Sequence, residues 1–220
     1  MGLGTLLMNK PVIILGAGGH SAVLIDILRK QQRPIIALVA PKVSSSAIFE
    51  NFQIFQNEND ILKYSPEDIG LVNGVGSLPG SNLRHDLFTN FSNKGYQFET
   101  IIDESAIISP YAILMQGVQV MAGVVIQTGS QVGENTIVNT GAIIDHDCQV
   151  GSSNHIAPGS VLSGNVITNA NVHIGTGAQI IQSIQIEKNA IIGAGTTITK
   201  NVFESEIIFP ARNYVKKGRL

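Results

Sequence analysis

The chain has 220 residues, with 14 Lys and Arg against 16 Asp and Glu, and a net charge of −2. Apolar residues make up 44% and charged residues 14%, which excludes an intrinsically disordered chain because disorder needs low hydrophobicity and high charge. No excess of positive charge is present to attract nucleic acid. The single cysteine, Cys148, excludes an internal disulfide and fits a reducing compartment.

The longest apolar runs, such as residues 12–15 and 35–40, fall far short of the roughly 18 residues that a membrane span needs. The first residues lack the basic segment of a secretory signal. Met8 resembles a natural start, so the predicted fold begins there. We therefore expect a cytoplasmic protein without a membrane span.

Residues 11 to about 100 predict alternating strands and helices. The predicted strands cover residues 11–15, 35–39 and 71–75, and the predicted helices cover residues 21–30 and 84–93. The second helix is expected to bury one face that holds Leu83, Leu87, Phe88 and Phe91. This alternation is typical of a small α/β unit with a parallel sheet.

From about residue 106 the pattern changes to a period of six. Apolar residues fill all but one of sixteen positions from Ile108 to Ile198, and Thr168 is the exception. Three places after these positions, twelve of the sixteen residues are Gly or Asn, which adopt left-handed backbone most easily. The pattern predicts short strands and tight corners, stacked as triangular coils of about 18 residues. The general crossover rule predicts right-handed coils.

Several motifs resemble those of the hexapeptide-repeat acyltransferases, in particular the branch of sugar acetyltransferases that includes PglD and the sialic-acid O-acetyltransferases. The resemblance covers nearly all of residues 9–213. It rests on the hexads and on four segments: Ile14–His20, Asn139–Asp147, His155–Gly159 and Gly164–Val166.

The resemblance implies coils that wind left-handed and an enzyme that acts as a homotrimer. We therefore expect a fold of α/β plus all-β class. A small Rossmann-like N-terminal domain (residues 8–100) binds a nucleotide sugar, and a left-handed parallel β-helix (residues 101–220) carries the acetyltransferase function. The basic residues Arg212, Lys216, Lys217 and Arg219 of the C-terminal tail would meet CoA phosphates or remain solvated.

Acetyl transfer to an amine or hydroxyl needs a base, and a histidine suits this near neutral pH. His146 follows an inward position by two residues, so it is expected to point away from the coil interior. The resemblance implies that His146 is the catalytic base and that Asp147 orients it, with Asp145 as a competitor for that role. It also implies that His155, Gly164, Thr176 and Ala194 contact acetyl-CoA.

The glycine-rich turn at residues 16–19 precedes a predicted helix, whose free N–H groups favour an anion. A dinucleotide site is not expected, because Ser21 stands in place of the third glycine and no acidic residue ends the second strand. The resemblance implies instead that Gly18, Gly19, His20 and Gly76 hold a nucleotide-linked sugar. Ala40 and Pro41 replace two aspartates that relatives often use for the base, which leaves the nucleotide open.

Two further histidines and one arginine allow other interpretations. His173 lies 18 residues after His155, so we expect it to stack beside His155 and to be exposed. His85 is expected to be solvated, and Arg84 is either a substrate-side residue or a solvated helix charge. A zinc site of the γ-carbonic anhydrase type is not expected, because the His-x4-His pair of that family is absent.

The sequence thus predicts an N-acetyltransferase that uses acetyl-CoA, with no metal, and acts on a UDP-linked 4-amino-4,6-dideoxy-N-acetylhexosamine for bacterial surface glycans. One alternative is a sialic-acid O-acetyltransferase. Another, of a different class, is a non-catalytic scaffold that binds sugar nucleotides but not CoA.

Overall fold

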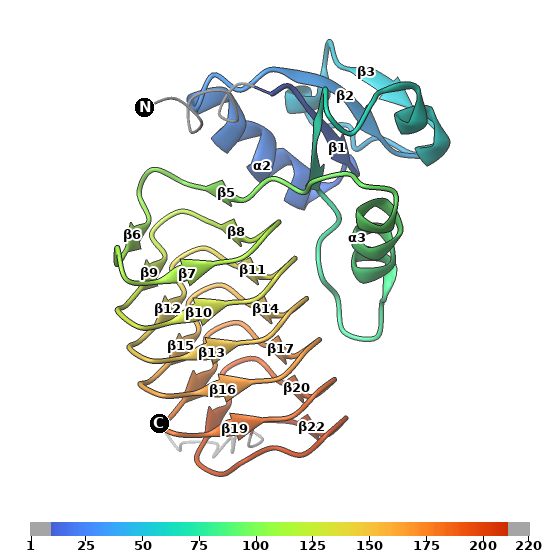
Figure 1. Cartoon of the computed structure of the whole chain (residues 1–220). Helices are drawn as coiled ribbons and strands as arrows, with labels where there is room; N and C mark the ends of the chain where they lie inside the picture. Colours follow the sequence, from blue (N-terminus) through green and yellow to red (C-terminus); the bar gives the residue numbers. More distant parts are fainter. Residues whose placement is uncertain (1–9, 211–220) are drawn as a thin grey trace, which may run out of the picture.

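The computed structural model describes residues 10–210 and has two parts, an α/β layer above a tall parallel coil (Figure 1). The first part contains β1 (Val12–Leu15), α2 (Gly19–Lys30), β2 (Ile35–Val39), η1 (Ala47–Phe49), β3 (Gln53–Phe55), η2 (Glu58–Lys63), β4 (Gly70–Asn73) and α3 (Leu83–Asn93). Its parallel sheet has the order β3-β2-β1-β4. The predicted strands and helices are confirmed, whereas β3 and the two 3-10 helices were not anticipated.

Strand β1 is buried on both faces, which explains why its sequence is a continuous apolar run rather than an alternation. Val12 and Ile14 join the cluster that includes Leu24 and Leu28 of α2. Ile13 and Leu15 face the opposite cluster, which includes Phe91 of α3. The sheet is therefore covered by helices on both sides.

The second part consists of two-residue strands in three parallel sheets. The first sheet holds β5 (Ile101–Ile102), β8 (Gln119–Val120), β11 (Ile137–Val138), β14 (His155–Ile156), β17 (His173–Ile174), β20 (Ile191–Ile192) and β22 (Ile207–Ile208). The second holds β6 (Ile107–Ile108), β9 (Val125–Ile126), β12 (Ile143–Ile144), β15 (Val161–Leu162), β18 (Gln179–Ile180) and β21 (Thr197–Ile198). The third holds β7 (Ile113–Leu114), β10 (Gln131–Val132), β13 (Gln149–Val150), β16 (Ile167–Thr168) and β19 (Gln185–Ile186).

The six-residue period maps directly onto this coil. The inward positions from Val120 to Ile198 are all buried, and Ile108 and Leu114 are half-buried in the first coil. Eleven of the twelve Gly and Asn corner residues have positive φ, and Asn201 is the exception. The register pairs residues 18 apart, as in His155 with His173. The corners turn the chain and the apolar column fills the interior.

The α/β layer sits on the top of the sheet that begins with β5. Ile101, Met121 and Ile137 of that sheet belong to the same apolar cluster as Val12 and Ile14 of β1 and the inner face of α2. Helix α3 and the loop before it descend along the same sheet (Figure 1). The loop between β4 and α3 therefore contacts the β-helix on one of its three sides.

Helix α3 buries a stripe different from the predicted one. Arg84, Phe88 and Phe91 face inward, whereas Leu83 is 53% exposed. The prediction was wrong for Leu83 because it assumed that apolar residues define the buried face, and here a buried arginine occupies the first turn. None of the helices within residues 10–210 combines the length and apolar character of a membrane span.

Candidate active site

His146 and Asp147 form a corner of the coil between β12 and β13. The ring Nδ1 of His146 lies 2.9 Å from Oδ2 of Asp147, and both side chains are more than half exposed. Asp147 has φ 59°, which an aspartate tolerates at a corner better than most residues. A carboxylate only accepts a hydrogen bond, so Nδ1 carries the proton and donates it. The other ring nitrogen, Nε2, keeps its lone pair.

Asp145 does not contact the ring. Its Oδ1 accepts a hydrogen bond from the backbone N–H of His146 at 2.8 Å. The hydrogen bond that Nδ1 donates to Asp147 and, more weakly, the charges of Asp145 and Asp147 raise the pKa of His146 above its ordinary value. Of the two candidate partners, the geometry therefore brings Asp147, and not Asp145, to the imidazole.

Glycines above and below make room for this pair. A Cβ at Gly164, one coil further on, would lie 2.5 Å from Nε2 of His146. A Cβ at Gly129, one coil earlier, would collide with the carboxylate of Asp147. The backbone N–H of Gly164 has no hydrogen-bond partner among the described residues. The imidazole therefore lies directly over Gly164, with an unused backbone donor close by.

Thr176 and Ala194 lie at the corner between the first and second sheets, not at the His146 corner. Both are exposed, and Gly195 N–H donates to the Thr176 carbonyl at 2.8 Å. Of the four residues predicted to contact acetyl-CoA, only Gly164 therefore shares a corner with His146.

His155 lies on the sheet that faces the α/β layer, away from the His146 corner. Asn139 Nδ2 donates to His155 Nε2 at 3.1 Å, and His155 Nδ1 donates to the Ser77 carbonyl at 3.2 Å. Burial, followed by the nearby His173 and His20, lowers the pKa of His155 to about 4. His155 is therefore neutral near pH 7, and both of its ring nitrogens are engaged within the chain.

His173 stacks beside His155 as predicted, with ring centroids 5.0 Å apart in an edge-on arrangement. The prediction that it is exposed was wrong. The loop before α3 covers this part of the sheet and leaves His173 half-buried, its Nδ1 without a hydrogen-bond partner among residues 10–210. Burial also lowers its pKa. His85 is exposed as predicted, and its Nδ1 lies 3.2 Å from Ser153 Oγ.

His20 lies in the first turn of α2 and reaches the β-helix. Its Nε2 is 2.7 Å from Gln119 Oε1, while Gln119 Nε2 donates to the Asn73 carbonyl at 2.8 Å. Because the Asn73 carbonyl can only accept, the orientation of the Gln119 amide is fixed and Nε2 of His20 carries the proton. Burial and the Arg84 charge lower the pKa of His20 to about 4. His20 is thus a neutral group with Nδ1 as an acceptor.

Arg84 is buried, so the alternative of a solvated helix charge is wrong. Its Nη1 donates to the carbonyls of Asn73 and Val75 at 2.8 Å and 2.7 Å, and its Nε donates to the Asn135 carbonyl at 3.1 Å. Burial lowers its pKa to about 9. Arg84 ties the end of β4 to the β-helix and so fixes the start of the loop that contains Gly76.

Two of the four predicted substrate residues, His20 and Gly76, line a cavity of about 360 Å³. Asn139 and His155 line it as well. Gly18 and Gly19 are exposed, and a Cβ on either would meet no atom within 4 Å. Helix α2 begins at Gly19 with no acidic residue in its first turn, so no carboxylate opposes an anion at its N-terminus. Asn139 and Gln119 were missed as site residues; Gln119 is the outward residue of β8, and Asn139 directly follows β11.

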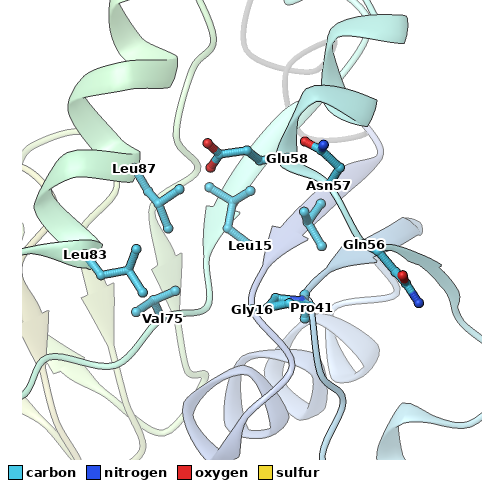
Figure 2. A pocket seen from close by; sticks show the side chains of 11 residues that line it. Leu15, Gly16, Pro41, Gln56, Asn57, Glu58, Val75, Leu83 and Leu87 are labelled. Atoms are coloured by element: carbon cyan, nitrogen blue, oxygen red, sulfur yellow. The ribbon is translucent and has the colours of Figure 1, made fainter.

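Ser21, which stands in place of the third glycine of a dinucleotide fingerprint, connects the loops after β1 and β4. Its Oγ donates to the Gly74 carbonyl at 2.9 Å. A second cavity, of about 340 Å³, lies beyond these loops at the carboxyl ends of β1, β2 and β4. Figure 2 shows Leu15 and Gly16 on one wall and Leu83 and Leu87 of α3 on the other. Ligands of parallel sheets bind at this kind of edge.

Comparison with known proteins places this geometry in a family. The model of the PglD N-terminal domain matches residues 11–91. The acetyltransferase domain of PglB from Neisseria gonorrhoeae is 30% identical with a TM-score of 0.81, covering 90% of this chain and 96% of that one. PerB from Caulobacter crescentus, solved with CoA and GDP-perosamine, is 31% identical with a TM-score of 0.78, covering 90% and 92%. The chain belongs to the PglD-type sugar acetyltransferases.

WeeI from Acinetobacter baumannii shares the fold of this acetyltransferase, with 20% identity and a TM-score of 0.76. Comparison with curated proteins gave no match.

The β-helix is left-handed, as the family resemblance implied, and the right-handed prediction of the general crossover rule was wrong. That rule describes long crossovers between twisted strands, whereas this acetyltransferase turns two-residue strands at tight left-handed corners. The basic tail residues after Pro210 lie outside the described residues.

Proposed function

We propose that this chain transfers an acetyl group from acetyl-CoA to the amino group of a nucleotide-linked amino-dideoxy sugar, in the cytoplasm, for a bacterial surface glycan. The observation that carries the proposal is the His146 imidazole, with Nδ1 donating to Asp147 at 2.9 Å and Nε2 free over Gly164. The resemblance favours a UDP-linked 4-amino-4,6-dideoxy-N-acetylhexosamine as the acceptor. The solved relative PerB was crystallised with a GDP-linked amino sugar.

In the proposed reaction the sugar amine attacks the thioester carbonyl, so that an N–C bond forms and the C–S bond breaks. His146 Nε2 takes the proton that the amine loses, and that proton passes to the CoA sulfur as it leaves. Asp147 holds the ring and stabilises the imidazolium. The backbone N–H of Gly164, which has no partner among the described residues, would donate to the developing oxyanion. Main-chain groups of Thr176 and Ala194, and His155, are proposed contacts of acetyl-CoA.

The acceptor sugar is proposed to bind between the α/β layer and the β-helix. The N-terminus of α2 at Gly18 and Gly19 would accept the diphosphate, because its N–H groups are exposed and unopposed by acidic residues. His20 and Gly76 line the neighbouring cavity and would contact the sugar.

A homotrimer is part of this proposal because the histidine corner and the sugar cavity lie on opposite sides of a single chain. His146 lies at the corner between the second and third sheets, whereas His20, Gly76 and His155 lie against the first sheet, on the opposite side of the triangle. A neighbouring copy could bring its histidine corner to the sugar cavity. The outward positions of the second sheet supply an apolar surface for such packing: Ile107, Val125, Ile143 and Val161.

Replacing Ile143 by Glu is expected to dissociate the trimer into folded monomers. Ile143 is 38% exposed in the single chain, so its replacement leaves the monomer core intact but puts a charge into the subunit contact. Sedimentation velocity should show the loss of the trimer, and acetyl transfer should fall in parallel. The matched control is Gln149→Glu, an exposed outward position on the third sheet. An I143E protein that stays trimeric would reject this surface.

Replacing Asp147 by Asn is expected to move the acidic limb of the pH–rate profile to lower pH. The base works when neutral, so kcat/KM rises as the pH increases through the pKa of His146. Asp147 raises that pKa, and its removal lets the pKa fall back toward the ordinary value. The rate at the plateau should also fall, because the imidazolium loses its partner. An unchanged limb would show that Asp147 does not act on the base.

The direct test of the function is acetyl transfer measured by release of the CoA thiol. UDP- and GDP-linked 4-amino-4,6-dideoxy sugars are the acceptors, and free sialic acid tests O-acetylation. Turnover of an amino sugar with no turnover of sialic acid supports the proposal. Binding of a sugar nucleotide without binding of CoA in calorimetry would indicate a scaffold and would reject the enzyme.

A further inference from the structure

The cavity at the carboxyl ends of β1, β2 and β4 is mostly apolar, and Glu58 is the one charged residue among its lining. The family resemblance implies that the nucleotide base lies at the end of β2, where Ala40 and Pro41 line this cavity. We propose that the Glu58 carboxylate, which also lines it, selects guanine over uracil. The inference rests on the proposed function, since it identifies which nucleotide carries the acceptor sugar. It goes beyond that function by naming the base and the residue that recognises it.

The position of the cavity fits a base that is connected to the sugar site. The chain order β3-β2-β1-β4 reverses between β1 and β4, and Gly16 and Val75 follow those two strands. Ligands of open parallel sheets bind in the crevice at such a reversal. Val75 and Leu83 line both this cavity and the sugar cavity. A nucleotide sugar can therefore extend from one cavity to the other past the N-terminus of α2.

The walls of the cavity suit a flat ring. Leu15 lies on one side and Leu83 and Leu87 of α3 lie on the other (Figure 2). Leu83 is 53% exposed, and a stacked base would cover it. The volume of about 340 Å³ is in the range of small-molecule sites. Burial of apolar ring surface against these leucines would stabilise the complex.

The polar side of the cavity is supplied by η2 and the residues before it. Glu58 is the one charged residue that lines it, and Figure 2 shows its carboxylate directed toward α3 on the side of Leu87. None of the ion pairs within residues 10–210 involves Glu58. Gln56 and Asn57 also line this side, while Ala40 and Pro41 add no acceptor or donor side chain. The exposed carboxylate is therefore accessible to a hydrogen-bond donor of a ligand.

The hydrogen-bonding edges of the bases decide between the nucleotides. Guanine carries N1–H and N2–H side by side, so it can donate two parallel hydrogen bonds to one carboxylate. Uracil carries a single N3–H between two carbonyl oxygens, and those oxygens would face the carboxylate with like partial charge. Adenine and cytosine offer only an exocyclic amine beside a ring acceptor. Glu58 thus favours guanine and disfavours uracil most clearly.

The test is calorimetric binding of GDP, UDP, ADP and CDP to the full chain without acetyl-CoA. GDP should bind about 10- to 100-fold more tightly than UDP, the range expected for hydrogen bonds to a charged group in place of repulsion. Glu58→Gln should weaken GDP binding by a similar factor and tighten UDP binding, because the amide can donate to a uracil carbonyl. Glu67→Gln, an exposed glutamate outside the cavity, is the matched control and should change neither.

Equal affinity for GDP and UDP, or a preference for UDP, would overturn the proposal. So would a preference for GDP that survives in E58Q, or the absence of nucleotide binding. Glu58 is exposed, so the variant is expected to fold, and an unchanged melting temperature checks this. The binding experiment contains no acetyl-CoA, so its result does not depend on whether the chain transfers acetyl groups. If the preferred base is not guanine, acetyl transfer can still be measured with another nucleotide sugar.

Discussion

Replacing His146 by Asn should lower kcat for acetyl transfer by about 10²- to 10⁴-fold, the range that a positioned general base contributes. The variant keeps the size of the side chain but has no basic nitrogen. His146 is exposed at a corner and supports no core residue, so folding and assembly should remain normal. Steady-state kinetics with CoA-thiol detection measure the loss, and sedimentation confirms the assembly.

The control for this variant is His85→Asn, which alters an exposed histidine of α3 on the other side of the chain. Its activity should match that of the unaltered protein. If H146N turned over the amino sugar at the normal rate while folded and assembled, His146 would not be the base. The other histidines of the site would then need the same test, although burial keeps His20 and His155 neutral and hydrogen-bonded.

Replacing Gly164 by Ala should lower kcat about 10- to 100-fold with little change in stability, because displacement of a catalytic group by about 1 Å can reduce the rate to this degree. The added methyl group would lie 2.5 Å from Nε2 of His146, so the exposed ring must move away. The backbone of Gly164 is not in the left-handed region, so alanine introduces no backbone strain there. Kinetics and thermal unfolding together separate the two effects.

Gln182→Ala is the matched control, since Gln182 is the exposed residue one coil beyond Gly164 at the same corner. It should leave both kcat and the melting temperature unchanged. A G164A protein with normal kcat would show that the position of the ring over Gly164 is not needed for catalysis. A large fall in the melting temperature would show instead that Gly164 is needed for the stability of the β-helix.

The β-helix was predictable because its corners repeat a local requirement. Each coil needs an apolar residue inside and a left-handed residue at a turn, and the sequence meets both needs every six residues from Ile108 onward. His146 could be placed outside the coil by counting from Ile144 for the same reason. Strand β3 escaped prediction because Gln53–Phe55 is short and pairs at the edge of the sheet, where tertiary contact outweighs a weak local pattern. The division of the chain at residue 100 stays a prediction.

The sequence by itself determined the coil, the alternating α/β segment and the outward position of the His146–Asp147 pair, because these follow from local backbone preference and from periodic burial. Only the tertiary structure decided that Arg84 is buried against Asn73, Val75 and Asn135, and that His173 is half-covered. Those environments depend on the α/β layer packing against one side of the coil, and contacts between distant segments leave no periodic signal in the chain. Packing within the α/β layer likewise brings Glu58 of η2 and Leu87 of α3 to the cavity beside β1, although they lie far apart in the sequence.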